Sequence, residues 1–205
     1  MPKNLKDIVF VSALRTSIGK LNGVYSKYKS HELGALVIKE IINRTNLDPK
    51  KIDEVIMGQV LTGLTGQNPA RQSAISANIP IEKTAYVINQ VCGSGLRSVA
   101  AAYQSILSND AKIIIAGGQE SMSNSTEEAM LKDGLIDAYN NYHIGITAEN
   151  VAEKWNISRK DQDHFAFESQ NKAQQAIKNK KFKRYSFCFC FKNIHWKIKW
   201  YLFKV

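Results

Sequence analysis

The sequence predicts a layered α/β fold, in which a mixed, largely parallel β-sheet is flanked by helices. Over the first 120 residues, short apolar runs alternate with segments of helical periodicity. Strands separated by helices are joined by crossover connections, which favour parallel pairing. Hydrophobic residues make up 44% of the chain and charged residues 22%, as is typical of a chain that buries a core.

The first strand and the first helix are predicted from the N-terminal 50 residues. Residues 7–12 (DIVFVS) form a short apolar run that is typical of a buried strand. Ser30 is expected to cap a helix with apolar residues on one face. That face contains Leu33, Leu36, Val37 and Ile41. Asp48 followed by Pro49 is a second cap signal, because proline is favoured at the first helical position.

Three further strands are predicted at residues 54–60, 84–89 and 112–116. Asn68 and Pro69 repeat the cap-and-proline signal between the first two of them. A well-patterned helix is expected before the last of them. Its apolar stripe contains Leu96, Val99, Ala100, Tyr103 and Leu107. These elements, residues 1–118, are predicted to form the α/β core.

Residues 119–183 are predicted to leave the sheet. Residues 119–146 are polar and irregular, and helices are expected at 146–155 and 158–180. Ser158 with Asp161 three residues later is an acidic variant of a capping box. This part of the chain is therefore interpreted as an excursion from the core.

Residues 184–205 differ in composition from the rest of the chain. They contain no Gly, Pro, Ala, Asp or Glu, and aromatic residues crowd together with Lys and Ile. We expect this tail to be unstructured or translated out of frame, because it lacks the gatekeeper charges of mixed sign that protect apolar segments. Binding to a membrane surface is the alternative, since aromatic and basic residues favour lipid interfaces.

The net charge of +10 does not indicate nucleic-acid binding. Residues 178–205 contain nine Lys and Arg and no Asp or Glu, which leaves 19 basic and 18 acidic residues in the remainder. The charge therefore does not form a basic surface on the core. No apolar run is long enough for an integral membrane segment. With three cysteines and no signal-peptide pattern, the protein is expected to be cytoplasmic.

Cys92 stands out as a candidate nucleophile. It follows a predicted strand and precedes a predicted helix, where unsatisfied backbone N–H groups favour an anion. Positions of this kind favour the reactive thiolate, and nearby N–H groups can stabilise an oxyanion. Gly93 and Gly95 leave room for a substrate carbonyl. The alternative is a buried cysteine that packs as a small hydrophobic residue.

Several segments carry a resemblance to a known family. The run 88–99, INQVCGSGLRSV, is the longest of them. The others are SALRT at 12–16, GQNPARQ at 66–72, AGGQESMS at 116–123 and YHIGITAENVA at 142–152. Together these motifs resemble the N-terminal half of a thiolase, over about residues 6–183. Within that family the chain is most similar to the acetyl-CoA acetyltransferases.

The resemblance implies a fold and a chemistry. The expected fold is the thiolase-like layered α/β fold, with residues 119–183 forming part of the loop domain. The implied function is acyl transfer, in which Cys92 takes an acyl group from acetyl-CoA or a 3-ketoacyl-CoA. The backbone N–H of Cys92 would contribute to the oxyanion hole. His143 and Ile144 align with positions near the pantetheine arm of CoA. No cofactor is implied beyond the CoA thioester substrate, and a homodimer is the family expectation.

Motifs from the second half of the family are missing from the sequence. Thiolases use a Gly-His-Pro histidine to activate the nucleophile, and none of His31, His143, His164 and His195 is followed by proline. The family's Cys-x-Gly-Gly and Asn-Glu-Ala-Phe elements are also missing. We expect this chain to be an incomplete enzyme, weakly active or inactive. Since the partner half is missing, we also expect an exposed apolar face, low stability or aggregation.

Alternative functions remain open at this point. Ketoacyl synthases resemble thiolases and also use a cysteine, although the NQVCGSG and YHIGITAEN segments favour a thiolase. A non-catalytic remnant that pairs with a full-length thiolase belongs to a different class. Metal binding by Cys188, Cys190 and His195 is not favoured, because their spacing does not match the two ligand pairs of a zinc site.

Overall fold

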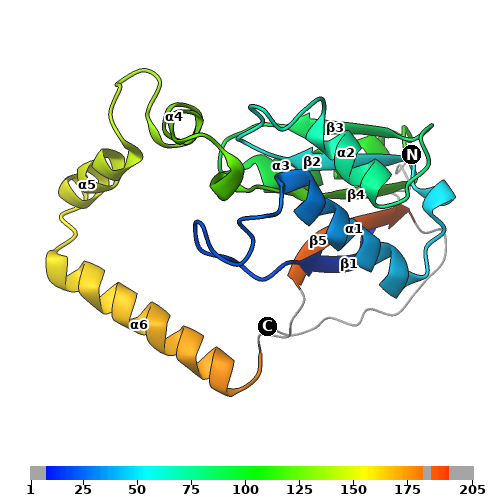
Figure 1. Ribbon diagram of the computed structural model, residues 1–205. Helices are drawn as coiled ribbons and strands as arrows, with labels where there is room; N and C mark the ends of the chain where they lie inside the picture. The colour runs from blue at the N-terminus through cyan, green and yellow to red at the C-terminus, as the bar shows by residue number, and fades with distance from the viewer. Residues whose placement is uncertain (1–7, 182–185, 194–205) are drawn as a thin grey trace, which may run out of the picture.

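The computed structural model describes residues 8–181 together with the backbone of residues 186–193. A five-stranded sheet forms the core, and a helical arm leads away from it (Figure 1). The core elements are β1 (Ile8–Arg15), α1 (Ser30–Thr45), the 3₁₀ turn η1 (Pro49–Lys51), β2 (Glu54–Gly58), α2 (Pro69–Ser76), β3 (Thr84–Ile88), α3 (Ser94–Leu107), β4 (Ile113–Gly118) and β5 (Ser186–Asn193). The arm contains η2 (Met122–Asn124), α4 (Glu127–Ala129), the π-helical turn η3 (Met130–Leu135), α5 (Ile144–Lys154) and α6 (Arg159–Lys178).

The sheet is mixed and largely parallel, as predicted. Its strand order is β1-β5-β4-β2-β3. β2 lies between β3 and β4 and pairs with both in parallel, whereas β5 is antiparallel to β4 and to β1. Because β2, β3 and β4 run in one direction, their carboxyl ends meet at the same edge of the sheet. That edge leads into the arm and also into the turn before α3.

Helices cover both faces of the sheet. On one face, α1 and α2 pack against alternate side chains of β2 and β4, including Val55, Met57 and Ile115. On the other face, α3 packs against Ile56 and Ile114. This alternation is what two-sided burial of a strand requires. The α/β class is therefore confirmed.

Segment 186–193 corrects the expectation of an unstructured tail. It forms β5 and fills the position between β1 and β4. Aromatic residues have high β propensity, and a strand in this position satisfies the backbone groups of both neighbours. The other tail residues, including His195, lie outside the described residues, as do the side chains of Cys188 and Cys190. The out-of-frame origin stays a prediction, as does the division of the chain at residues 118 and 183.

Two local predictions on the helices are corrected. α1 has Lys29 rather than Ser30 at its N-cap, and Glu32 accepts a hydrogen bond from the Lys29 backbone N–H. In α3 the buried face consists of Ser94, Ser98, Ala102 and Ile106. The predicted apolar stripe lies mainly on the outer side, where Leu96 is 76% exposed. Small residues face the sheet because α3 approaches it closely, so apolar periodicity indicated the wrong face.

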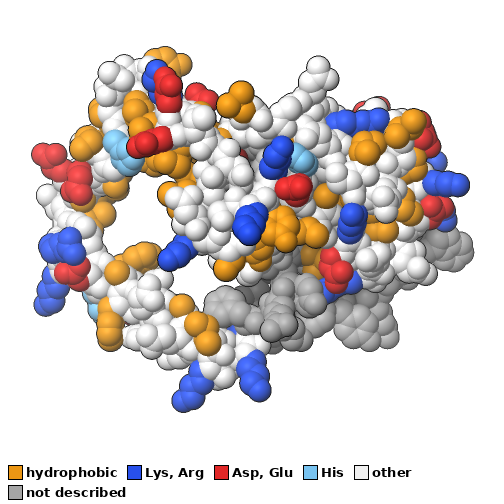
Figure 2. Space-filling model, viewed as in Figure 1, with side chains coloured by type: hydrophobic (Ala, Val, Ile, Leu, Met, Phe, Trp, Pro, Cys, Tyr) orange, Lys and Arg blue, Asp and Glu red, His pale blue; other side chains and the backbone are white. Residues whose placement is uncertain are grey.

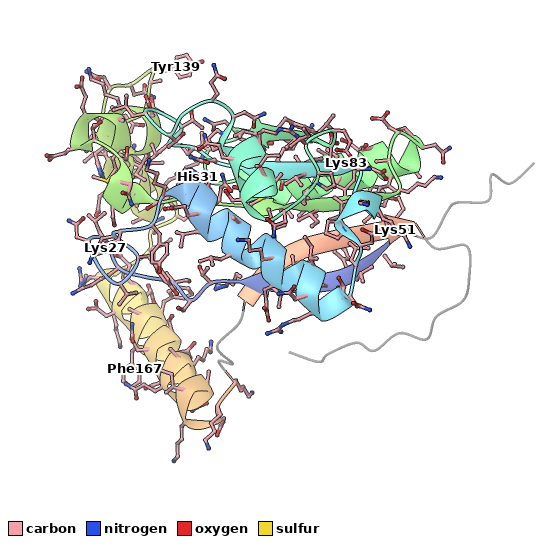
Figure 3. All side chains as sticks on the ribbon, turned by 45° about the vertical axis from the view of Figure 1, so that its right-hand side comes forward. Lys27, His31, Lys51, Lys83, Tyr139 and Phe167 are labelled. Carbon is pink, nitrogen blue, oxygen red and sulfur yellow. The ribbon has the colours of Figure 1, made fainter. Side chains whose placement is uncertain are left out.

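Helices α5 and α6 of the arm stand away from the core (Figure 1). No residue of α5 or α6 is buried. Figure 3 shows Phe167 on α6 and Tyr139 on the loop before α5, both directed away from the sheet. Figure 2 shows an opening ringed by the arm and the core, with apolar side chains on both. Helix formation in the arm therefore depends on local signals, such as the confirmed capping box between Ser158 and Asp161.

Candidate active site

Cys92 lies in a tight turn between β3 and α3, as predicted. Gly93 is the N-cap of α3, so Cys92 stands immediately before the cap. Its side chain is exposed, which contradicts the alternative of a cysteine packed in the core. The first N–H groups of α3 lie next to it in sequence, and a helix N-terminus attracts negative charge. The position therefore suits a nucleophile that must meet a substrate from solvent.

Hydrogen bonds hold this turn in an unusual backbone conformation. Val91 has φ 48°, a left-handed value that is rare for a β-branched residue. Its N–H donates to Asn89 Oδ1 at 2.9 Å, and its carbonyl oxygen accepts from Ser94 Oγ at 2.5 Å. Ser94 Oγ also accepts from the Gln90 N–H at 2.8 Å. These contacts fix the residues on both sides of Cys92, which offsets the cost of the strained residue.

Glycines let the start of α3 pack directly on the sheet. A Cβ at Gly58 would lie 2.3 Å from the backbone carbon of Ser94. A Cβ at Gly118 would lie 3.3 Å from the Cα of Gly95. The glycines at the carboxyl ends of β2 and β4 therefore determine how closely the N-terminus of α3 approaches the sheet. A larger residue at Gly58 would push the Cys92 turn outward.

A buried polar network supports the same edge of the sheet. Gln119 accepts from Ser73 Oγ at 2.6 Å and donates to Gln59 Oε1 at 2.9 Å. Next to it, Glu120 Oε2 accepts from the Val60 N–H at 2.9 Å and, more weakly, from the Leu61 N–H at 3.4 Å. Burial raises the pKa of Glu120, although these backbone N–H groups oppose the shift. The network links the residues that follow β2 and β4.

His143 and Ile144 lie at the start of α5. His143 is the N-cap, and its Nδ1 accepts from the Gly145 N–H at 3.0 Å. Because Nδ1 accepts this bond, the ring proton of a neutral imidazole is assigned to Nε2. Ile144 is partly exposed. Both residues belong to the arm, and within residues 8–181 no hydrogen bond joins either of them to the Cys92 turn.

Other site types find no counterpart among the described residues. In that part of the chain, no three His, Cys, Asp or Glu side chains are grouped to hold a metal ion. No helix of residues 8–181 is both long and apolar enough to cross a bilayer.

Sequence reasoning missed the supporting residues of the site. Asn89, Ser94 and Glu120 lie within the motifs at 88–99 and 116–123, yet nothing in their spacing shows that they meet. For Asn89 and Glu120 the signal was their position just after two parallel strands, whose carboxyl ends lie at one sheet edge. Assigning their hydrogen bonds required the folded backbone.

Comparisons with known proteins agree with these features. The family model of the thiolase N-terminal domain matches residues 8–185. Acetyl-CoA acetyltransferase of Paracoccus denitrificans is 52% identical over 190 residues, which cover 85% of this chain and 49% of that protein. The acetyl-CoA acetyltransferase of Rhizobium meliloti (strain 1021) is 49% identical over 191 residues, with coverage of 85% and 49%. A probable acetyl-CoA acyltransferase of Staphylococcus epidermidis (strain ATCC 35984) is 47% identical over 186 residues, with coverage of 82% and 47%.

The chain spans about half the length of the curated relatives that it matches. The match begins at β1, includes the Cys92 turn and ends after α6. The predicted family resemblance is confirmed: the chain belongs to the thiolase family and corresponds to its N-terminal half.

Proposed function

We propose that this chain carries the acyl-accepting part of an acetyl-CoA acetyltransferase, with Cys92 as the nucleophile. The single observation that carries the proposal is the exposed thiol in a hydrogen-bonded turn at the head of α3. Family membership and relatives named acetyl-CoA acetyltransferase support the choice of substrate.

The proposed step is transfer of the acetyl group from one sulfur to another. Cys92 Sγ attacks the carbonyl carbon of acetyl-CoA, and the bond between that carbon and the CoA sulfur breaks. The proton of the Cys92 thiol ends on the released CoA thiol, so that atoms and charge balance. Backbone N–H groups at the turn, including that of Cys92, would stabilise the oxyanion of the tetrahedral intermediate. The CoA thioester is the only small molecule that this step needs.

The second half of the reaction requires groups beyond those seen in these 205 residues. The sequence has no histidine followed by proline and no Cys-x-Gly-Gly segment to act on protons. General acid–base groups contribute about 10²–10⁴-fold each. We propose that this chain by itself accepts an acetyl group far more slowly than a complete thiolase and does not turn over.

Substrate contacts on the arm are part of the proposal. His143 Nε2 and the exposed side chain of Ile144 would contact the pantetheine arm of CoA. This assignment is supported by the motif at 142–152 and by the bond to Nδ1, which leaves the ring proton of a neutral imidazole on Nε2. A 3-ketoacyl-CoA as a second substrate and a homodimer are carried by the family resemblance alone. A cytoplasmic location is carried by the cysteine content and the N-terminal sequence alone.

Incubation with acetyl-CoA followed by intact-mass measurement tests the proposal. We expect a mass increase of one acetyl group in the wild type and none in Cys92→Ala. Cys188→Ala is the matched control, because it removes a different thiol and should leave the adduct in place. A wild-type protein that takes up no acetyl group would support the alternative of a non-catalytic remnant or partner of a full-length thiolase.

A further inference from the structure

We propose that Glu120 is a positioning residue that holds the Cys92 turn through Val60 and Asn89. The inference rests on the proposed function, because it concerns the residue that accepts the acetyl group. Glu120 lies two residues after β4, outside the turn itself, and it is connected to the turn through other residues.

A relay of hydrogen bonds connects the carboxyl group to the turn. Glu120 Oε2 accepts from the Val60 N–H at 2.9 Å. The carbonyl oxygen of Val60 accepts from Asn89 Nδ2 at 3.4 Å, and Asn89 Oδ1 accepts from the Val91 N–H at 2.9 Å. The next residue is Cys92. The side-chain amide of Asn89 therefore donates through Nδ2 to Val60, which is bonded to Glu120, and accepts through Oδ1 from Val91, the residue before Cys92.

The turn needs such support because of its backbone conformation. Val91 is held at a positive φ, which a β-branched residue adopts only when its surroundings impose it. The bond from the Val91 N–H to Asn89 is one of the contacts that impose it. If the Val60 carbonyl shifts, Asn89 loses its anchor, and Val91 and Cys92 are free to relax.

The cost of burying Glu120 also indicates a specific role. Its Oε1 is buried and has no hydrogen-bond partner among the described residues. Burial disfavours the charged carboxylate, so the group spends more of its time protonated than an exposed glutamate does. What the side chain gains in return is the bond to the Val60 N–H, a weaker one to Leu61 and one to the backbone of Ser121. Those bonds tie the loop after β2 to the loop after β4.

The test compares Glu120→Ala and Glu120→Gln in single-turnover acetylation of Cys92 by acetyl-CoA. We expect Glu120→Ala to lower the rate at saturating acetyl-CoA by about tenfold, because small displacements of a reacting group are costly. The concentration for half-saturation should not change. Glu120→Gln keeps an acceptor for Val60 and should restore the rate to within about twofold. Glu153→Ala, an exposed glutamate on α5, is the matched control and should match the wild type.

A double-mutant cycle with Asn89→Ala tests the relay. If Glu120 acts through Asn89, the double variant should be no slower than the slower single variant. Independent, multiplying effects would overturn the proposal, as would an unchanged rate in a folded Glu120→Ala protein or a failure of Gln to rescue.

Hydrogen exchange of the amides at residues 89–93 gives a readout that does not need acetyl transfer. Faster exchange there in Glu120→Ala, with β2 and β4 unchanged, would support the positioning role even if the wild type accepted no acetyl group. In that case the proposed function alone would fail. Unchanged exchange at 89–93 would overturn the positioning role instead.

Discussion

The α/β core and the helical arm contain the same kinds of residues but use them differently. In the core, Ile106 and Ile114 have no exposed surface, whereas no residue of α5 or α6 is buried. Phe167 on α6 is 64% exposed. The difference teaches that apolar side chains stabilise this chain only where they are buried between packed helices and strands. The arm forms its helices from caps and local ion pairs, such as Arg159 with Asp163, which contribute little to stability.

Large-to-small substitutions in the two regions should give the largest contrast. Ile114→Ala removes a fully buried side chain between β4 and α3 and should lower the free energy of unfolding by about 2–5 kcal/mol. Ile177→Ala on α6 removes an exposed side chain and should change it by less than about 0.5 kcal/mol. Urea unfolding followed by circular dichroism measures both. Equal losses would show that the arm is packed in solution.

Glycines at the sheet edge offer the next largest effect. Gly58→Ala places a Cβ 2.3 Å from the backbone of Ser94, so α3 must shift. We expect a loss of about 1–3 kcal/mol, typical of overpacking, together with slower acetylation of Cys92. Gly63→Ala is the control, because nothing lies within 4 Å of its Cβ position. The account would be wrong at this point if Gly58→Ala acetylated as fast as Gly63→Ala.

The pH dependence of stability should reveal the buried carboxyl group of the core. Burial raises the pKa of Glu120 above the ordinary value of 4.5. The folded state therefore binds the proton more tightly than the unfolded state. The stabilisation that results from this proton binding is fully present below pH 4.5 and is lost as the pH rises through the folded pKa. The stability of Glu120→Gln relative to the wild type should therefore increase over that range and then level off. Urea unfolding at a series of pH values measures this, and a constant difference would contradict the shift.

The outer face of α3 should behave like the arm rather than the core. Leu96→Gln replaces a side chain that is 76% exposed and should change the free energy of unfolding by less than about 0.5 kcal/mol. Because it reduces an exposed apolar surface, it should lower aggregation measured by light scattering. Ala102→Gln on the buried face of the same helix should instead destabilise the protein. A strongly destabilised Leu96→Gln would mean that this face is covered in solution.

Local signals made the element types predictable, but tertiary contacts decided the rest. Asn68 before Pro69 and Ser158 before Asp161 marked true helix starts, because their cap hydrogen bonds are formed within a few residues. The stripe through Leu96 was expected to face the sheet, but it lies mainly on the outer side of α3. Gly58 packs so closely on Ser94 that the face of α3 with small residues is the one turned to the sheet. β5 could not be predicted from its own pattern, because its position depends on the space between β1 and β4.

The site shows the same division. Cys92 was predictable from the strand-to-helix junction and the neighbouring glycines, since both features are local. The support that Asn89 and Glu120 give to the turn was not predictable. Glu120 accepts a hydrogen bond from the N–H of Val60, which lies 60 residues away in the sequence. The contacts of His143 and Ile144 with CoA stay predictions.

Peptide mapping after incubation with acetyl-CoA tests the central claim most directly. The account predicts one acetyl group on the peptide that contains Cys92, attached as a thioester and therefore released by neutral hydroxylamine. An acetyl group found only on lysine, on Cys188 or Cys190, or on no residue at all would contradict Cys92 as the acyl acceptor.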